Sequence, residues 1–404
     1  MKTKFARLYE AALAASTATV AHLSEKKKLS VRMQVASDYI KGLKELRAQR
    51  VRSEGGAKKQ IGDWAAETAR YTVRDVFGSN LPPIPITVRK REPGTEAYIP
   101  RIDHLYRFRP SVLSGVLTWF NTRGILKDSL WLYGPTGSGK TSVFEQACAR
   151  LNIPLFAFEG HERREAPEFF GSWVNGPRGM YWMDGPVTAA ARVGGMVLIN
   201  EGDAIPQSAL IGLNGVLEGY PVFIPETKEI IPIKEGFGIA FACNTNGSGD
   251  LCGFYIATLR MNIAFGDRFQ HVPVNYMEPQ DEIEVLISKV PQLSKGLAKE
   301  MVRFANEVRD AFLKGSMELT FSTRTLIRWA YLSNFHMVLK QEGGEPLAYA
   351  LNHALAFRGE EATRMALLDM GHRVFGGNLD VWKNGGLKLK ASPTEERCGQ
   401  TNEE

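Results

Sequence analysis

The octapeptide GPTGSGKT, at residues 134–141, matches the pattern G-x-x-x-x-G-K-[ST]. It follows the apolar run SLWLY (129–133) and precedes TSVFEQACARL (141–151), so the sequence predicts a strand, a loop and a helix in that order. Glycines let such a loop fold closely around phosphate oxygens, and the backbone N–H groups of the loop and helix N-terminus point toward the bound anion. We therefore expect a nucleotide site formed by Gly134, Pro135, Thr136, Gly137, Ser138, Gly139, Lys140 and Thr141.

Two side chains of this loop have separate expected tasks. Lys140 would reach the β- and γ-phosphates, and the hydroxyl of Thr141 would bind Mg²⁺. The loop does not distinguish ATP from GTP, and it does not show whether the nucleotide is hydrolysed. The segment NEGD (200–203) resembles the guanine-reading pattern N-K-x-D of GTPases but lacks its lysine, so it gives no support for GTP.

Short apolar runs alternate with helical patterns around this loop. LWLYG (130–134), PLFAFEG (154–160), MVLIN (196–200) and GIAFACN (238–244) each end at a turn or polar residue. The alternation predicts an α/β fold, in which a parallel sheet carries helices on its faces.

The rest of the chain predicts three further regions. Apolar spacing favours helices up to residue 78, the stretch GSNLPPIPIT (78–87) is typical of a linker, and the helical pattern returns after residue 277. The expected domains are a helical N-terminal region (1–96), the α/β nucleotide-binding domain (97–277), a helical lid (278–365) and a flexible C-terminal tail (366–404).

The positive charge of the chain is concentrated near its N-terminus. Residues 1–109 hold 22 Lys and Arg against 11 Asp and Glu, whereas the remainder holds 28 against 33. Such asymmetry leaves two readings open: a nucleic-acid partner, or a solvated helical surface that faces water or an acidic protein. No recognition motif for nucleic acid accompanies the charge.

Cysteine usage and hydropathy indicate the compartment. None of the four cysteines (Cys148, Cys243, Cys252 and Cys398) belongs to a C-x-x-C pair, so neither a zinc site nor a disulfide framework is indicated. No apolar run approaches the roughly 20 residues that span a bilayer. We therefore expect a cytoplasmic protein without a membrane partner.

The strand MVLIN is followed by an acid, as the metal-facing strand of a nucleotide hydrolase should be. Two acids in a row are usual there, but this chain has Asn200 followed by Glu201. Asn200 keeps one acceptor oxygen for Thr141 or a metal-bound water, yet it lacks the negative charge that would hold Mg²⁺. Asp203 is the expected source of electrostatic compensation. The sequence therefore predicts an active hydrolase with weakened Mg²⁺ affinity, and a nucleotide-binding relic is the alternative.

The order and spacing of GPTGSGKT, MVLINEGD, GIAFACNTNGSGDLCGFY, FGDRFQ and FSTRTLIRWA resemble AAA+ ATPases of the MoxR type, and within them the CobS-like group. The resemblance covers residues 100–340 and implies ATP and Mg²⁺ as ligands. It makes MVLINE the Walker B strand with Glu201 as catalytic base, and Asn200 a metal-site residue. Asn244 becomes the sensor 1 residue, Arg268 the arginine finger offered to a neighbouring subunit, and Arg324 the sensor 2 arginine of the lid.

Each of these roles also has a simpler structural reading. Asn244 could cap its strand, and Arg268 could form a surface salt bridge. Arg324 follows Ser322, a candidate helix N-cap, and a cation in a first helical turn favours a bound anion.

Two segments have the pattern of β-hairpins, at 169–186 and 219–236. In the family that the chain resembles, such insertions decorate the ring face near its pore. The alternative is that their aromatic side chains pack only on the core.

The resemblance implies a homo-oligomeric, hexameric ring that hydrolyses ATP to remodel a partner protein, together with a separate partner that carries a von Willebrand factor A domain. Two other functions stay open: a nucleic-acid-linked motor that uses the basic N-terminal region, and an ATP-gated scaffold without turnover. The sequence does not identify the substrate.

Overall fold

The computed structural model describes residues 71–78, 81–177, 179–250, 253, 255, 258–339 and 346–375. The helices expected before residue 71, Cys252, Cys398 and the tail after residue 375 lie outside these residues. The chain divides into two compact units, one that extends to Asn275 and one that begins at Tyr276 and also includes the loop residues Thr136–Ser138.

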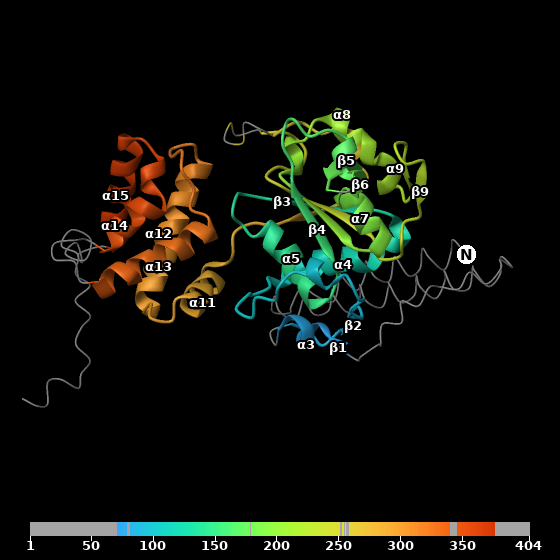
Figure 1. Cartoon of the computed structure of the whole chain (residues 1–404). Helices are drawn as coiled ribbons and strands as arrows, with labels where there is room; N and C mark the ends of the chain where they lie inside the picture. The colour runs from blue at the N-terminus through green and yellow to red at the C-terminus, as the bar shows by residue number, and fades with distance from the viewer. Residues whose placement is uncertain are drawn as a thin grey trace, which may run out of the picture. The chain divides into compact units, whose positions relative to one another are not determined.

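The first unit is built on a five-stranded parallel sheet with the strand order β11-β3-β10-β7-β4 (Figure 1). Its strands are β3 (Ser129–Tyr133), β4 (Leu155–Glu159), β7 (Met196–Asn200), β10 (Gly238–Cys243) and β11 (Phe269–Pro273). The α/β fold and the strands predicted from the apolar runs are therefore confirmed. Because all strands run the same way, their carboxyl ends meet at one edge, where the loops that follow them can form a site.

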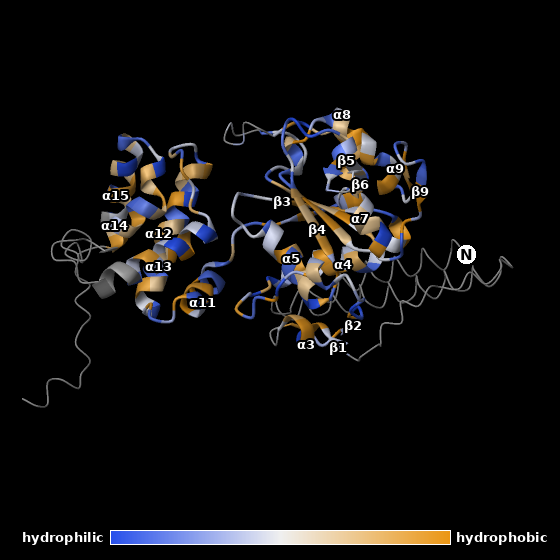
Figure 2. Cartoon of the chain, viewed as in Figure 1, coloured by the Kyte–Doolittle hydropathy of each residue, from blue (hydrophilic) through white to orange (hydrophobic). Residues whose placement is uncertain are grey.

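Alternation along each strand divides the core of this unit into two layers. Leu130 and Leu132 pack on one face of the sheet, whereas Trp131 packs on the other, where it stacks on Phe241 at 5.2 Å. Figure 2 shows these strands mainly in the hydrophobic colours, whereas the helices around them mix hydrophobic and hydrophilic residues. Burial on both faces explains why the strands appear in the sequence as nearly continuous apolar runs.

Helices and short elements complete the first unit. The helices are α3 (Val73–Phe77), α4 (Pro110–Leu126), α5 (Lys140–Arg150), α6 (Pro167–Phe170), α7 (Pro186–Val193), α8 (Gln207–Leu210), α9 (Asn214–Leu217) and α10 (Ile263–Gly266). The 3-10 helices are η1 (Glu96–Tyr98), η2 (Gly202–Ala204) and η3 (Ile211–Leu213), and the strands outside the main sheet are β1 (Tyr71–Thr72), β2 (Pro85–Ile86), β5 (Gly171–Gly176), β6 (Gly179–Asp184), β8 (Val222–Ile224) and β9 (Glu229–Ile231).

Residues 71–78 and 81–95 pack into the first unit. Among the described residues of the helical pattern expected up to residue 78, the helix is α3, which begins after Thr72 because the Thr72 side chain caps it in a capping box with Asp75. Four apolar side chains of the segment are buried in the core that contains α4 and α5: Val73, Phe77, Leu81 and Ile84. The stretch expected to be a linker therefore contributes to the core through its apolar residues.

Both expected hairpins are confirmed as antiparallel pairs, β5 with β6 and β8 with β9. Their side chains divide between core and solvent. Trp182 packs against the core, whereas Trp173 is 48% exposed and Tyr181 is 50% exposed. The hairpins therefore present aromatic side chains to solvent as well as to the core.

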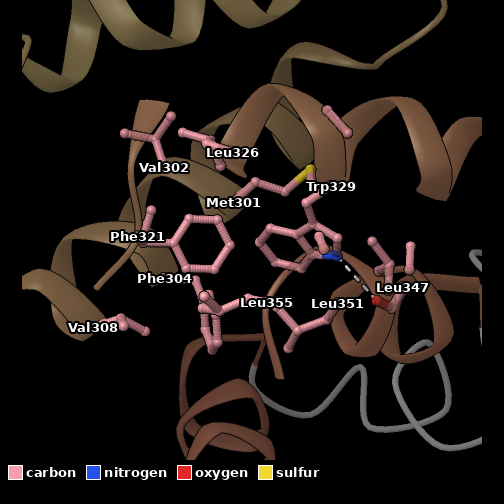
Figure 3. Packing of buried hydrophobic residues seen from close by; sticks show 14 of the residues in the cluster. Met301, Val302, Phe304, Val308, Phe321, Leu326, Trp329, Leu347, Leu351 and Leu355 are labelled. Atoms are coloured by element: carbon pink, nitrogen blue, oxygen red, sulfur yellow. Dashed lines mark hydrogen bonds between the residues drawn. The ribbon is translucent and has the colours of Figure 1, made fainter. Parts of the chain in front are cut away.

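The second unit is helical, as the sequence predicts for the lid. Its helices are α11 (Pro279–Lys289), α12 (Lys295–Leu313), α13 (Thr323–Leu339), α14 (Pro346–Ala354), the 3-10 helix η4 (Ala356–Arg358) and α15 (Glu361–Phe375). Figure 3 shows Trp329 beside Phe304 and Phe321 in the core, where its indole N–H donates to the carbonyl of Leu347 at 3.0 Å. The boundary expected at residue 365 falls inside α15, whose buried side chains include Leu367 and Val374.

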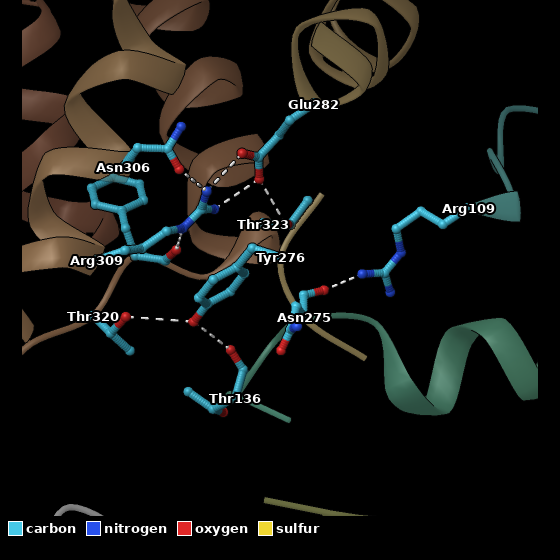
Figure 4. A network of polar contacts seen from close by, with 10 residues as sticks. Arg109, Thr136, Asn275, Tyr276, Glu282, Asn306, Arg309, Thr320 and Thr323 are labelled. Carbon is cyan, nitrogen blue, oxygen red and sulfur yellow. Dashed lines mark hydrogen bonds and ion pairs between the residues drawn. The ribbon is translucent and has the colours of Figure 1, made fainter. Parts of the chain in front are cut away.

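A buried ion pair joins two helices of this unit (Figure 4). Both terminal nitrogens of Arg309 donate to the carboxylate of Glu282 at 2.7 Å, and the Thr323 hydroxyl donates to the same carboxylate at 2.7 Å. The guanidinium also donates to the carbonyl of Phe321 and lies 4.1 Å from the ring centre of Tyr276. The charges are therefore paired, as a buried position requires.

Within the described part of the chain, no helix is both long enough and apolar enough to cross a membrane.

Candidate nucleotide-binding site

The loop between β3 and α5 has the backbone geometry that its glycines predict. Gly134 has φ 151°, and a Cβ atom there would lie 2.3 Å from the carbonyl oxygen of Val274, so only glycine fits. Gly139 caps α5 in the left-handed region, with φ 93°. The N-terminus of α5 therefore follows directly from the loop, where its free N–H groups can receive an anion.

Lys140 is folded over this loop. Its ammonium donates to the carbonyl of Gly134 at 2.8 Å and to the side-chain oxygen of Asn244 at 3.0 Å. Burial lowers the pKa of Lys140, and the nearby Glu201 carboxylate acts in the opposite direction. The arrangement links the loop to the end of β10, the strand that lies between β3 and β7.

Thr141 contacts the end of β7. Its hydroxyl donates to the side-chain oxygen of Asn200 at 2.7 Å, the contact expected from the sequence. The amide nitrogen of Asn200 donates in turn to the carboxylate of Glu159 at 2.9 Å. The sequence analysis missed Glu159, although the residue is the last of β4 and precedes Gly160 in PLFAFEG, so its position at a strand end was a usable signal.

Glu201 follows β7 and has φ 49°, a left-handed conformation that is uncommon for residues other than glycine. The side-chain nitrogen of Asn244 donates to its carboxylate at 2.6 Å. The side chain is accessible to solvent, but the surrounding loops remove part of its water. This burial, followed by repulsion from Asp203, raises the pKa of Glu201. A raised pKa makes the carboxylate a stronger base.

Asp203 is fully buried, and one of its carboxylate oxygens faces the segment after β10. That oxygen accepts hydrogen bonds from the backbone N–H of Thr245 at 2.8 Å and from the Thr245 hydroxyl at 2.9 Å. Asp203 therefore holds the residue next to Asn244. Among the described residues, the carboxylate that accepts a hydrogen bond from Asn200 is that of Glu159, and the electrostatic compensation expected from Asp203 stays a prediction.

The two expected arginines lie on different units. Arg268 stands between α10 and β11, at the helix-to-strand junction predicted for it, and forms a 2.6 Å ion pair with Glu218. Arg324 is exposed in the first turn of α13, which begins in the second unit. Ser322 caps that helix, because its hydroxyl accepts from the N–H of Thr325 at 3.0 Å. The catalytic roles of both arginines stay predictions.

The donor set suits a hard divalent cation that also binds phosphate. The side-chain oxygens of four residues lie at one edge of the sheet, and oxygen is the ligand that Mg²⁺ prefers; the residues are Thr141, Asn200, Glu159 and Glu201. The described residues contain no group of three or more His, Cys, Asp or Glu that could hold a metal by themselves. Magnesium bound through one or two protein oxygens and through phosphates matches this pattern.

Two family models match the chain. Residues 129–254 match the AAA domain (dynein-related subfamily), and residues 282–374 match the CbbQ/NirQ/NorQ C-terminal domain. The first match spans the site from β3 to the segment after β10, and the second spans the helices of the second unit.

Three relatives are similar over much of their own length. The denitrification regulatory protein NirQ of Stutzerimonas stutzeri is 28% identical over 60% of this chain and 83% of its own. The aerobic cobaltochelatase subunit CobS of a Sinorhizobium species is 27% identical over 76% of this chain and 95% of its own. An uncharacterized protein of Staphylococcus saprophyticus is 30% identical over 50% of this chain and 76% of its own.

Proposed function

The chain belongs to the MoxR-type AAA+ ATPases, with NirQ and CobS among its relatives, and we propose that it binds ATP with Mg²⁺ and hydrolyses the nucleotide. We further propose that it does so as a hexameric ring that remodels a partner protein. The two family models and the relatives confirm the family that the sequence motifs resemble.

The observation that best supports hydrolysis is the hydrogen bond between the side chains of Asn244 and Glu201. The two residues follow different strands of the sheet, yet their side chains meet at 2.6 Å beside Lys140. Glu201 holds a backbone conformation that costs energy, and such strain is characteristic of functional sites. A scaffold that only bound nucleotide would need the loop and Lys140 but no base held by an amide.

The residues divide the chemistry among themselves. The loop N–H groups and Lys140 would bind the phosphates, and Glu201 would accept a proton from the attacking water that Asn244 helps to orient. Bound Mg²⁺ would neutralise phosphate charge, and Thr141 and Asn200 lie where they could hold it. Phosphoryl transfer depends mainly on such positioning and on electrostatic stabilisation.

The proposed ring and its partner are supported by residues outside the phosphate-binding loop. Arg268 is the proposed finger for a neighbouring subunit, and a head-to-tail interface closes into a ring when its rotation allows. Arg324 is proposed to sense the nucleotide from the lid. Exposed side chains on the two hairpins, among them Trp173, Met180 and Phe223, offer an apolar surface to a partner. A separate protein with a von Willebrand factor A domain remains the proposed partner class.

The experiment is phosphate release by the full-length protein with ATP or GTP in the presence of Mg²⁺. Wild type should release phosphate from ATP, and Lys140→Ala should lose both nucleotide binding and release. Binding of random DNA over a range of salt concentrations tests the motor alternative, since phosphate contacts make affinity fall steeply with salt. Binding of ATP without any release would instead support the scaffold and reject the proposal.

A further inference from the structure

We propose that Glu159 supplies the negative charge that β7 lacks at Asn200, so that the acid of the magnesium site stands on the neighbouring strand β4. The inference rests on the proposed nucleotide site and concerns how this chain holds its cation. It gives Glu159 a role that the sequence motifs do not assign.

The sheet brings the two residues together. Glu159 and Asn200 are paired partners in the parallel ladder of β4 and β7, and each is the last residue of its strand. Paired residues of neighbouring strands project from the same face of a sheet. The register of the sheet therefore places the two side chains next to each other, and the Asn200 amide nitrogen donates to the Glu159 carboxylate at 2.9 Å.

The hydrogen bonds fix the orientation of the Asn200 amide. An ionised carboxylate can only accept hydrogen bonds, so the amide nitrogen must face Glu159. The amide oxygen then faces Thr141, whose hydroxyl donates to it at 2.7 Å. Glu159 thus acts through Asn200 to direct an acceptor oxygen at the residue expected to bind Mg²⁺, while it adds a full negative charge to the same edge.

The other acids at this edge have different contacts. Asp203 accepts two hydrogen bonds from Thr245, and Glu201 accepts one from Asn244. Glu159 lies in an exposed position, where its carboxylate is accessible to a hydrated cation or its bound water. Of the acids in the described part of the chain, it is the one that hydrogen-bonds to Asn200.

An asparagine at position 200 suits this arrangement better than an aspartate. Aspartate has no hydrogen to donate to Glu159, and it would place two carboxylates side by side. Conversely, a glutamine at position 159 could donate to an aspartate at position 200. The pair should therefore tolerate exchange of the charge between the two strands.

Equilibrium binding of Mn²⁺, a paramagnetic substitute for Mg²⁺, tests the proposal. Free Mn²⁺ is measured by electron paramagnetic resonance with the full-length protein and a non-hydrolysable ATP analogue, so the readout does not depend on turnover. Glu159→Gln should weaken Mn²⁺ binding about 10- to 100-fold, the usual effect of losing an outer partner of a metal site. Affinity for the analogue without metal should not change. Glu162→Gln, an exposed acid in the segment after β4, is the matched control and should bind Mn²⁺ as wild type does.

Mn²⁺ binding by a double variant, in which the negative charge is moved from position 159 to position 200, is the decisive test. Asn200→Asp added to Glu159→Gln should restore most of the lost affinity, and it should help far more in that background than in wild type. Wild-type Mn²⁺ affinity in Glu159→Gln, or no recovery in the double variant, would overturn the proposal. Should Glu159→Gln fail to fold, Glu159→Asp keeps the charge and must retain tighter Mn²⁺ binding than Glu159→Ala. If wild type binds no nucleotide at all, the proposed function fails instead, so the two failures are distinguishable.

Discussion

Substitution of Arg268 is the clearest test of the proposed ring. Within its own chain the guanidinium pairs with Glu218 at 2.6 Å, with 27% and 45% of the two side chains exposed. A finger that serves a neighbouring subunit must leave this partner. The proposal therefore requires that the ion pair be weak compared with the stabilisation that Arg268 gives to the transferring phosphoryl group.

The two magnitudes are far apart. An exposed ion pair of this kind contributes about 0–1 kcal/mol, so its release changes an equilibrium by no more than about fivefold. An arginine finger raises turnover by about 10³- to 10⁵-fold, because the guanidinium cannot deprotonate and fits phosphate oxygens with two N–H groups. Arg268→Ala should therefore collapse turnover and leave ATP binding nearly intact. Glu218→Gln breaks the same ion pair, keeps the arginine, and should stay within about fivefold of wild-type turnover.

The assay is steady-state phosphate release, followed by complementation. Arg268→Ala and Glu201→Gln subunits should each be inactive alone. A mixture should recover activity, because mixed rings contain interfaces at which an intact Glu201 faces an intact Arg268. If the mixture stays inactive although the subunits co-assemble, or if Arg268→Ala and Glu218→Gln lose the same modest activity, then Arg268 is a surface arginine and the ring loses its main support.

Three further outcomes follow from the contacts. Since burial and then repulsion from Asp203 raise the pKa of Glu201, the acid limb of the pH profile of kcat/KM should lie at a higher pH than for an ordinary glutamate, and Asp203→Asn should move this limb to lower pH; an unchanged limb would contradict this assignment. Glu282→Ala leaves the buried guanidinium of Arg309 without its carboxylate and should destabilise the lid by about 3–5 kcal/mol in urea unfolding, whereas Arg303→Ala, which removes an exposed ion pair on the helix that also carries Arg309, should cost less than about 1 kcal/mol. Removal of residues 1–96 takes away Val73, Phe77, Leu81 and Ile84, the buried apolar side chains among the described residues of this segment, each worth about 1.5–3 kcal/mol. Circular dichroism should therefore show a strongly destabilised first unit, and an unchanged melting temperature would show that the segment is dispensable.

The sheet could be predicted because its strands are buried on both faces. Apolar runs such as MVLIN, bounded by turn residues, leave little choice of structure. The segment before residue 96 was harder, since its prolines indicate a linker while Leu81 and Ile84 pack into the core. Local composition does not show which surface an apolar side chain will meet.

The site could be predicted where its residues lie close together in the sequence. Lys140 and Thr141 belong to a contiguous motif, and Thr141 meets Asn200 as expected. Contacts that depend on register were not predictable from local pattern: Glu159 reaches Asn200 only because β4 and β7 pair as they do. The pairing of Arg268 with Glu218 likewise depends on how distant loops approach each other.

We propose Glu201 as the base of a working ATPase, and the claim can be tested by one substitution. Glu201→Gln keeps the shape of the side chain and an acceptor oxygen for Asn244 but removes the basic carboxylate. The most direct measurement is single-turnover phosphate release from bound ATP at saturating Mg²⁺, made on wild type and Glu201→Gln with their ATP affinities determined in parallel. We expect equal affinities, with release in wild type and almost none in the variant. Equal release from both proteins, or none from wild type at saturating Mg²⁺, would contradict the claim.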